Sequence, residues 1–120
     1  MRSLLILFLL GQLSSVHAYE KSDAFIIRAF DDRFKVLAPA VFMPELNVII
    51  ENKTMLPLVG KLQTLRGRVL KNTHLKSKGF MAEKLIVKKH ERIFFVPLSP
   101  PGQEVELIIG KKSYEIPPQR

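Results

Sequence analysis

The chain has 120 residues, of which 47% are hydrophobic and 25% charged, with a formal net charge of +8 and no cysteine. This length suits one domain of ordinary size. The lack of cysteine excludes a disulfide scaffold, a lipid anchor on cysteine and a blue-copper centre, since each of these needs a thiol.

Residues 1–18 have the three-part layout of a cleavable secretory signal peptide. Arg2 supplies a positive start, SLLILFLL is an apolar run, and Val16 and Ala18 are the small residues before a cut ahead of Tyr19. An anchor helix is the weaker alternative, because a span needs roughly twenty apolar residues. We expect an exported protein, periplasmic or extracellular, with one mature domain at residues 19–120 and no transmembrane span.

The first mature elements are predicted to be strands. Residues 24–37 (AFIIRAFDDRFKVL) hold two apolar runs around an acidic pair, which favours a hairpin or a bent edge strand. Pro39 and Pro44 mark a crossing segment that forms no regular ladder. Residues 46–51 alternate in polarity, which is typical of a strand with one face inward, and a turn at 52–54 follows.

The middle of the chain continues this pattern. Pro57 opens the alternating run at residues 58–65, and Gly67 stands where a turn requires positive φ. A second turn is predicted at 77–79. The segment GFMAEKLIVKK, residues 79–89, is the best helix candidate, but its β-branched pair and flanking charges favour a strand.

The last part, FFVPLSPPGQEVELIIGKKSYEIPP, reads as a strand, a proline corner, a second strand over 104–110, a turn and a short third strand stopped by Pro117 and Pro118. Seven to nine short runs with turn signals every eight to twelve residues predict an all-β fold. Specifically, we expect a single immunoglobulin-like antiparallel β-sandwich.

The proline corner has two interpretations. Proline lacks a ladder donor, so Pro97, Pro100 and Pro101 between two strands would prevent continuous pairing and stiffen a connection between sheets. The alternative is a docking loop for a partner that recognises polyproline geometry.

One stretch resembles a known family. The strand LNVIIENKT, which leads through Pro57 into the next strand, is similar to part of the first domain of periplasmic pilus chaperones. The likeness implies a sandwich fold. The paired basic anchor of those chaperones has no counterpart here and no second domain is expected, so neither their function nor any site residue is carried over.

No catalytic constellation is visible, and we predict a protein that is not an enzyme and needs no cofactor. No serine lies in a Gly-x-Ser-x-Gly elbow, and His74 and His90 are surrounded by lysines. The adjacent Asp31 and Asp32 fit a turn better than a paired-carboxylate site. Asn52-Lys53-Thr54 matches a glycosylation sequon, which has meaning only in a eukaryotic secretory pathway.

The charge is concentrated in the middle of the chain. Residues 61–92 carry ten Lys or Arg against two Glu, a net charge of +8, whereas the rest of the mature chain is close to neutral. On adjacent strands these side chains would form one basic face. Its candidate residues are Lys71, Lys76, Lys78, Lys84, Lys88, Lys89 and Arg92. Phe80 is the only aromatic residue in this segment, so sequence-specific nucleic-acid binding is not expected.

The leading hypothesis is an exported, non-enzymatic interaction module that docks a protein or an anionic envelope polymer through this basic face, with the proline corner as a second contact. A solvated face that only maintains solubility is the simplest alternative. A second alternative is a small periplasmic copper carrier, and a third is an accessory subunit of a larger envelope assembly. The copper carrier would use thioether and imidazole ligands drawn from His74, His90, Met43, Met55 and Met81.

Overall fold

The computed structural model describes residues 24–117, which form nine β-strands and no helix. The proposed signal peptide and Pro118 lie outside the described residues. The strands are β1 (Ala24–Ala29), β2 (Phe34–Leu37), β3 (Glu45–Asn52), β4 (Leu58–Thr64), β5 (Val69–Leu75), β6 (Phe80–Ile86), β7 (Ile93–Ser99), β8 (Val105–Glu106) and β9 (Ser113–Ile116).

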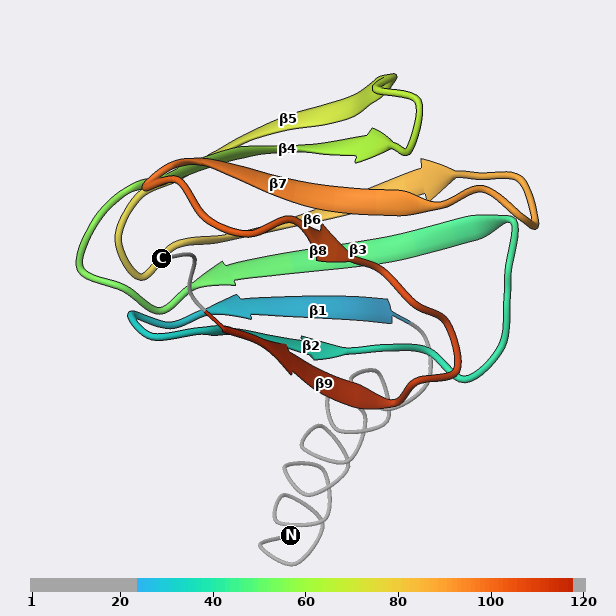
Figure 1. The fold of residues 1–120 in the computed structure, drawn as a ribbon, viewed down its shortest axis with the longest axis horizontal. Coiled ribbons are helices and arrows are strands. Elements are labelled where there is room, and N and C mark those ends of the chain that lie inside the picture. The colour runs from blue at the N-terminus through green and yellow to red at the C-terminus, as the bar shows by residue number, and fades with distance from the viewer. Residues whose placement is uncertain (1–23, 118–120) are drawn as a thin grey trace, which may run out of the picture.

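The strands form two packed sheets, so the prediction of an all-β sandwich is confirmed (Figure 1). Sheet A has the order β6-β3-β1-β2-β9, and sheet B has the order β5-β4-β7-β8. All pairs are antiparallel except β1 with β3, which is parallel. The immunoglobulin-like connectivity stays a prediction.

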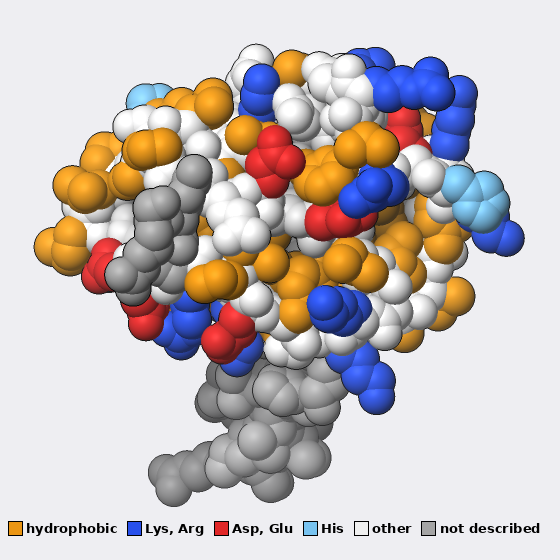
Figure 2. Space-filling view, viewed as in Figure 1, with side chains coloured by type: hydrophobic (Ala, Val, Ile, Leu, Met, Phe, Trp, Pro, Cys, Tyr) orange, Lys and Arg blue, Asp and Glu red, His pale blue; other side chains and the backbone are white. Residues whose placement is uncertain are grey.

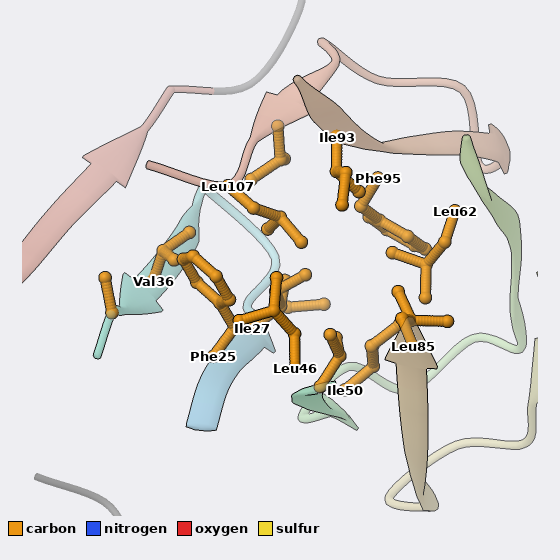
Figure 3. Close-up of a cluster of buried hydrophobic side chains, with 14 of the residues drawn as sticks. Phe25, Ile27, Val36, Leu46, Ile50, Leu62, Leu85, Ile93, Phe95 and Leu107 are labelled. Atoms are coloured by element: carbon orange, nitrogen blue, oxygen red, sulfur yellow. The ribbon is translucent and has the colours of Figure 1, made fainter. Parts of the chain in front are cut away.

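The core lies between the sheets and follows from strand alternation. In β3, Leu46, Val48 and Ile50 are buried, as the two-residue period predicts. Figure 3 shows side chains of sheet A, such as Phe25 and Ile50, pointing toward Leu62 and Phe95 of sheet B. Each large apolar side chain buried in this way stabilises the fold by roughly 1.5–3 kcal/mol.

Several local predictions are confirmed. Residues 24–37 form the β1–β2 hairpin, with Asp31 and Asp32 in its exposed turn. Gly67 has a φ of 92°, the left-handed geometry that its turn requires. The segment for which a helix was the alternative is the strand β6.

Three predictions need correction. The strand expected over 104–110 is reduced to the two residues of β8, because beyond Leu107, whose amide still donates to the Ile93 carbonyl of β7, the chain crosses toward sheet A. Strand β5 extends through polar residues 71–74, where no strand was predicted, because it is a sheet edge with one solvated face. Pro97 lies inside β7 and not in the corner. It faces Gly60 beside a register shift, a position that tolerates the missing ladder donor.

The sheet edges differ between the two sides of the sandwich. Strands β5 and β6 are the edges of sheets B and A, and a short turn at 76–79 joins them, so both lie on one side. Each has seven residues. The opposite edges are β8, with two residues, and β9, with four residues followed by Pro117. Short strands and proline blunt an edge, so sheet A is protected at β9.

Candidate functional site

The clearest candidate site is the outer edge of β6. Its pairing with β3 is bracketed by two hydrogen bonds: the Asn52 amide donates to the Gly79 carbonyl (2.8 Å), and the Val87 amide donates to the Pro44 carbonyl (2.9 Å). Antiparallel ladders alternate, so residues 81, 83 and 85 also direct their amides and carbonyls toward β3. The backbone groups of residues 80, 82, 84 and 86 therefore point outward. No described residue bonds to them.

The side chains of these same four residues are solvent-exposed. Phe80 is 71% exposed and Ile86 is 77% exposed, with Ala82 and Lys84 exposed between them. Met81 and Leu85 point the other way and pack against the core. The edge thus combines unpaired peptide groups with two exposed large apolar side chains.

Five of the predicted basic-face residues line this strand. Lys76 and Lys78 come just before β6, Lys84 lies within it, and Lys88 and Lys89 follow it. The strand itself spans about 23 Å at 3.3 Å per residue. We call this surface, made of β6 and its five lysines, the β6 side. In Figure 2, Lys and Arg side chains gather toward the right end of the molecule, where the β4–β5 and β6–β7 turns lie.

Nearby carboxylates compensate part of this charge. Lys84 Nζ lies 3.3 Å from the carboxylate of Glu45, and Lys71 Nζ on β5 lies 3.6 Å from that of Glu83 on β6. Lys78 Nζ donates to the carbonyl of Lys53 at 2.8 Å. No ion pair within residues 24–117 involves Lys76, Lys78, Lys88 or Lys89. Among these four lysines of the β6 side, Lys88 acts electrostatically on the Glu91 carboxylate, and the other three have no carboxylate partner among the described residues.

Arg92, also predicted for the basic face, is engaged elsewhere. Its guanidinium donates two hydrogen bonds to the Glu106 carboxylate, at 2.8 and 2.9 Å, and lies over the Phe94 ring. The hydrogen bond from Arg92 lowers the pKa of Glu106. This pair ties β8 to the start of β7 and leaves Arg92 little free charge for a partner.

A buried asparagine holds the turn that leads into β6. The side chain of Asn52 is fully buried, and its amide nitrogen donates to the carbonyls of Leu56, Leu75 and Lys76 at 2.8, 3.3 and 3.1 Å. Its oxygen accepts from the amide and hydroxyl of Thr54. The side-chain amide of the sequon asparagine is therefore fully hydrogen-bonded inside the protein, which is incompatible with glycosylation of the folded chain.

Glu91 holds the turn at the other end of β6. Its carboxylate accepts hydrogen bonds from the Arg68 side chain (3.2 Å) and the Lys88 amide (3.4 Å). Burial alone would raise the pKa of Glu91, but these hydrogen bonds lower it overall. The carboxylate stays charged at neutral pH, and the turn presents Lys88 and Lys89 to solvent.

A shallow hollow lies where β5 passes into β6. Its volume is about 550 Å³, and its lining is His74, Leu75, Lys76, Lys78, Gly79 and Phe80. It combines an exposed aromatic ring with lysines, which are features of surfaces that bind anionic groups beside apolar ones. The hollow adjoins the β6 edge and extends the β6 side.

The proline corner borders a separate cavity of about 310 Å³ at the left end of Figure 1, where the turns after β1, β3 and β7 meet. Pro100 and Pro101 line it together with Phe30, Phe34 and Leu56, whereas Pro97 is buried within β7. Only two of the three predicted corner residues therefore face this cavity. The cavity is mainly apolar, and its lining includes the exposed Asp31.

The candidate copper ligands are spread over the molecule. His74 lies on β5 and His90 in the β6–β7 turn, while Met81 packs against the core. Met43 and Met55 are exposed in two other connections. Across residues 24–117, no group of three or more His, Asp or Glu side chains is arranged to hold a metal ion.

Comparisons with protein families, with curated proteins and with solved structures found no match for this chain. In the described part of the chain, no helix has the length and apolar character that a membrane span needs.

Sequence reasoning identified the lysines of the β6 side but missed the free backbone of β6. The available signal was a proline-free run in which residues 80, 82, 84 and 86 fall on one face and include two large apolar residues. A large apolar residue on a solvated face is a cue for a contact surface. The cue becomes specific only when β6 is known to be an edge.

Proposed function

We propose that this protein is an exported, non-enzymatic interaction module that binds an anionic partner through the β6 side. One observation carries the proposal: five lysines, four of them without a described ion pair, line an edge strand that also exposes Phe80 and Ile86. Charge of one sign along a surface speeds the encounter with an oppositely charged partner, and exposed apolar groups then contribute contact area.

A protein partner fits this surface better than a polymer does. The lysines alone would serve an anionic polysaccharide, but Phe80 and Ile86 would then remain exposed to water at a cost. An acidic protein surface can cover both groups. Binding to an anionic envelope polymer is therefore the competing outcome of the test.

The test is capture in intact cells with a triple charge reversal, Lys84→Glu, Lys88→Glu and Lys89→Glu. Tagged wild type and variant are crosslinked in the native host, and the captured material is identified and quantified. We expect the variant to fold, since all three lysines are exposed, and to lose most of the capture. The matched control reverses Lys35, Lys111 and Lys112, which changes the net charge equally on β2 and the β8–β9 connection.

The outcomes distinguish binding through the β6 side from attraction by net charge alone. Loss of a defined protein from the first variant alone supports the proposal. Equal capture by wild type and both variants refutes it. Equal loss in both variants means that net charge, and not the β6 side, attracts the partner, which also overturns the proposal.

A further inference from the structure

We propose that the partner binds by strand addition, so that an extended acidic segment of a partner protein pairs antiparallel with β6 and becomes a sixth strand of sheet A. This inference rests on the proposed function and names the partner's chemistry and its mode of binding.

The backbone of β6 supplies the first argument. Four successive outward-facing residues, 80, 82, 84 and 86, present amide and carbonyl groups that no described residue bonds. Such a row is a template for another strand. The other sheet edges are less suited to pairing with a partner strand. Strands β8 and β9 are short, and the ladder of β5 with β4 has a register shift between Leu62 and Gln63. Among the described strands, β6 has the longest edge with a regular register.

The side chains of β6 specify what the added strand carries. Residues directly opposite each other in an antiparallel pair place their side chains on the same face. The added strand therefore needs apolar residues opposite Phe80 and Ile86 and an acidic residue opposite Lys84, at alternate positions. Beyond these, acidic residues at both ends would meet Lys78 at one end and Lys88 with Lys89 at the other.

Charge decides between a foreign segment and a second copy of this chain. Pairing of β6 with β6 of a second copy would bring two lysine-rich edges together, and closely opposed like charges destabilise a sheet. An acidic segment instead supplies the opposite charge along the whole edge. Only a polypeptide also supplies the alternating amides and carbonyls that the edge requires.

The first experiment uses a synthetic peptide, Ac-EEVTETVTVEE-NH2, titrated into the purified protein by calorimetry. Its first valine is designed to face Ile86, its central glutamate Lys84, its second valine Ala82 and its third valine Phe80. N-methylation of the valine that faces Ala82 removes an amide that points into the ladder and keeps every charge. We expect about a tenfold loss of affinity, the value of one lost hydrogen bond. N-methylation of the threonine just before that valine, whose amide points away from β6, is the matched control.

The second experiment changes the protein at the same point. The variant Ala82→Pro removes only an outward amide of β6, because the ladder with β3 uses residues 81 and 83. We expect Ala82→Pro to lower the affinity for the peptide by at least the same factor. The variant Ala82→Ser, which keeps the amide, should bind the peptide as tightly as the wild type does. Hydrogen exchange gives a readout that does not depend on folding of the proline variant. The amides of residues 82 and 84 should exchange fast in the free protein and become protected in the complex.

The outcomes separate this inference from the proposed function. One outcome is that both N-methylated peptides bind the wild-type protein with equal affinity, while the protein with the triple charge reversal binds them less tightly. In that case the β6 side binds acidic partners by charge, and strand addition is overturned. A wild-type protein that does not bind the peptide also overturns strand addition, while capture in cells still tests the function on its own. Selective loss with the inward-facing N-methyl group, together with protection at residues 82 and 84, supports the inference.

Discussion

The replacement Asn52→Ala tests whether one buried side chain organises the end of the sandwich that leads into β6. The side-chain amide of Asn52 makes five hydrogen bonds: three to the carbonyls of Leu56 in the β3–β4 connection, Leu75 at the end of β5 and Lys76 in the turn after it, and two with Thr54. Each bond contributes about 1 kcal/mol net, and a buried group left unpaired costs about 1–3 kcal/mol. Water can reach the groups near exposed Leu56, so the cost falls mainly on the carbonyls of Leu75 and Lys76.

We therefore expect Asn52→Ala to lower the free energy of unfolding by about 3 kcal/mol, and the melting temperature by roughly 12–24 °C for a domain of this size. The assay is urea unfolding followed by circular dichroism. Exposed Asn72 on β5 provides the control, because Asn72→Ala removes the same group from a solvated position and should change stability by less than about 0.5 kcal/mol. A loss below about 1 kcal/mol for Asn52→Ala, or equal losses for both variants, would refute the reasoning.

Three further predictions concern the core and its polar ties. Thr73 is buried, and its hydroxyl has no hydrogen-bond partner among the described residues, so Thr73→Val should stabilise the protein by up to about 1 kcal/mol in urea unfolding; a loss of stability would contradict this. The Tyr114 hydroxyl donates to the Glu106 carbonyl (2.6 Å) and accepts from the Ile108 amide (2.9 Å), so Tyr114→Phe should cost about 1–2 kcal/mol, whereas an unchanged midpoint would show that water replaces both bonds. Because Arg92 lowers the pKa of Glu106, this pair stabilises the fold above the unfolded glutamate pKa of about 4.3, and its contribution disappears as pH falls through the folded value. The stability difference between wild type and Arg92→Met should therefore be largest at pH 7 and shrink as pH falls below the folded pKa of Glu106, and a difference independent of pH would refute the assignment.

Local sequence patterns were enough to predict many of the strands and turns. The alternation of Leu46, Val48 and Ile50 identified both the strand β3 and its buried face, because a strand half-buried in a sandwich must place every second side chain in the core. The positive φ of Gly67 was equally visible, since few other residues adopt that geometry at low cost.

Other features depend on contacts between distant parts of the chain. Polar β5 is a strand because β4 provides its ladder, and Pro97 is tolerated within β7 because its position faces a register shift. For the candidate site, the count of lysines was evident from the sequence. Their division into paired and unpaired charges was not, because Glu45 and Glu106 approach Lys84 and Arg92 only after folding.

The unequal edges of sheet A have a consequence for stoichiometry. A ladder that grows by strand addition needs a free edge at both ends to propagate, and β9 ends at Pro117 after four residues. A segment received at β6 therefore cannot be followed by a second strand at β9, and sheet A does not join one molecule of this protein to the next. Because sheet A offers one such edge, titration should reach saturation at equimolar peptide.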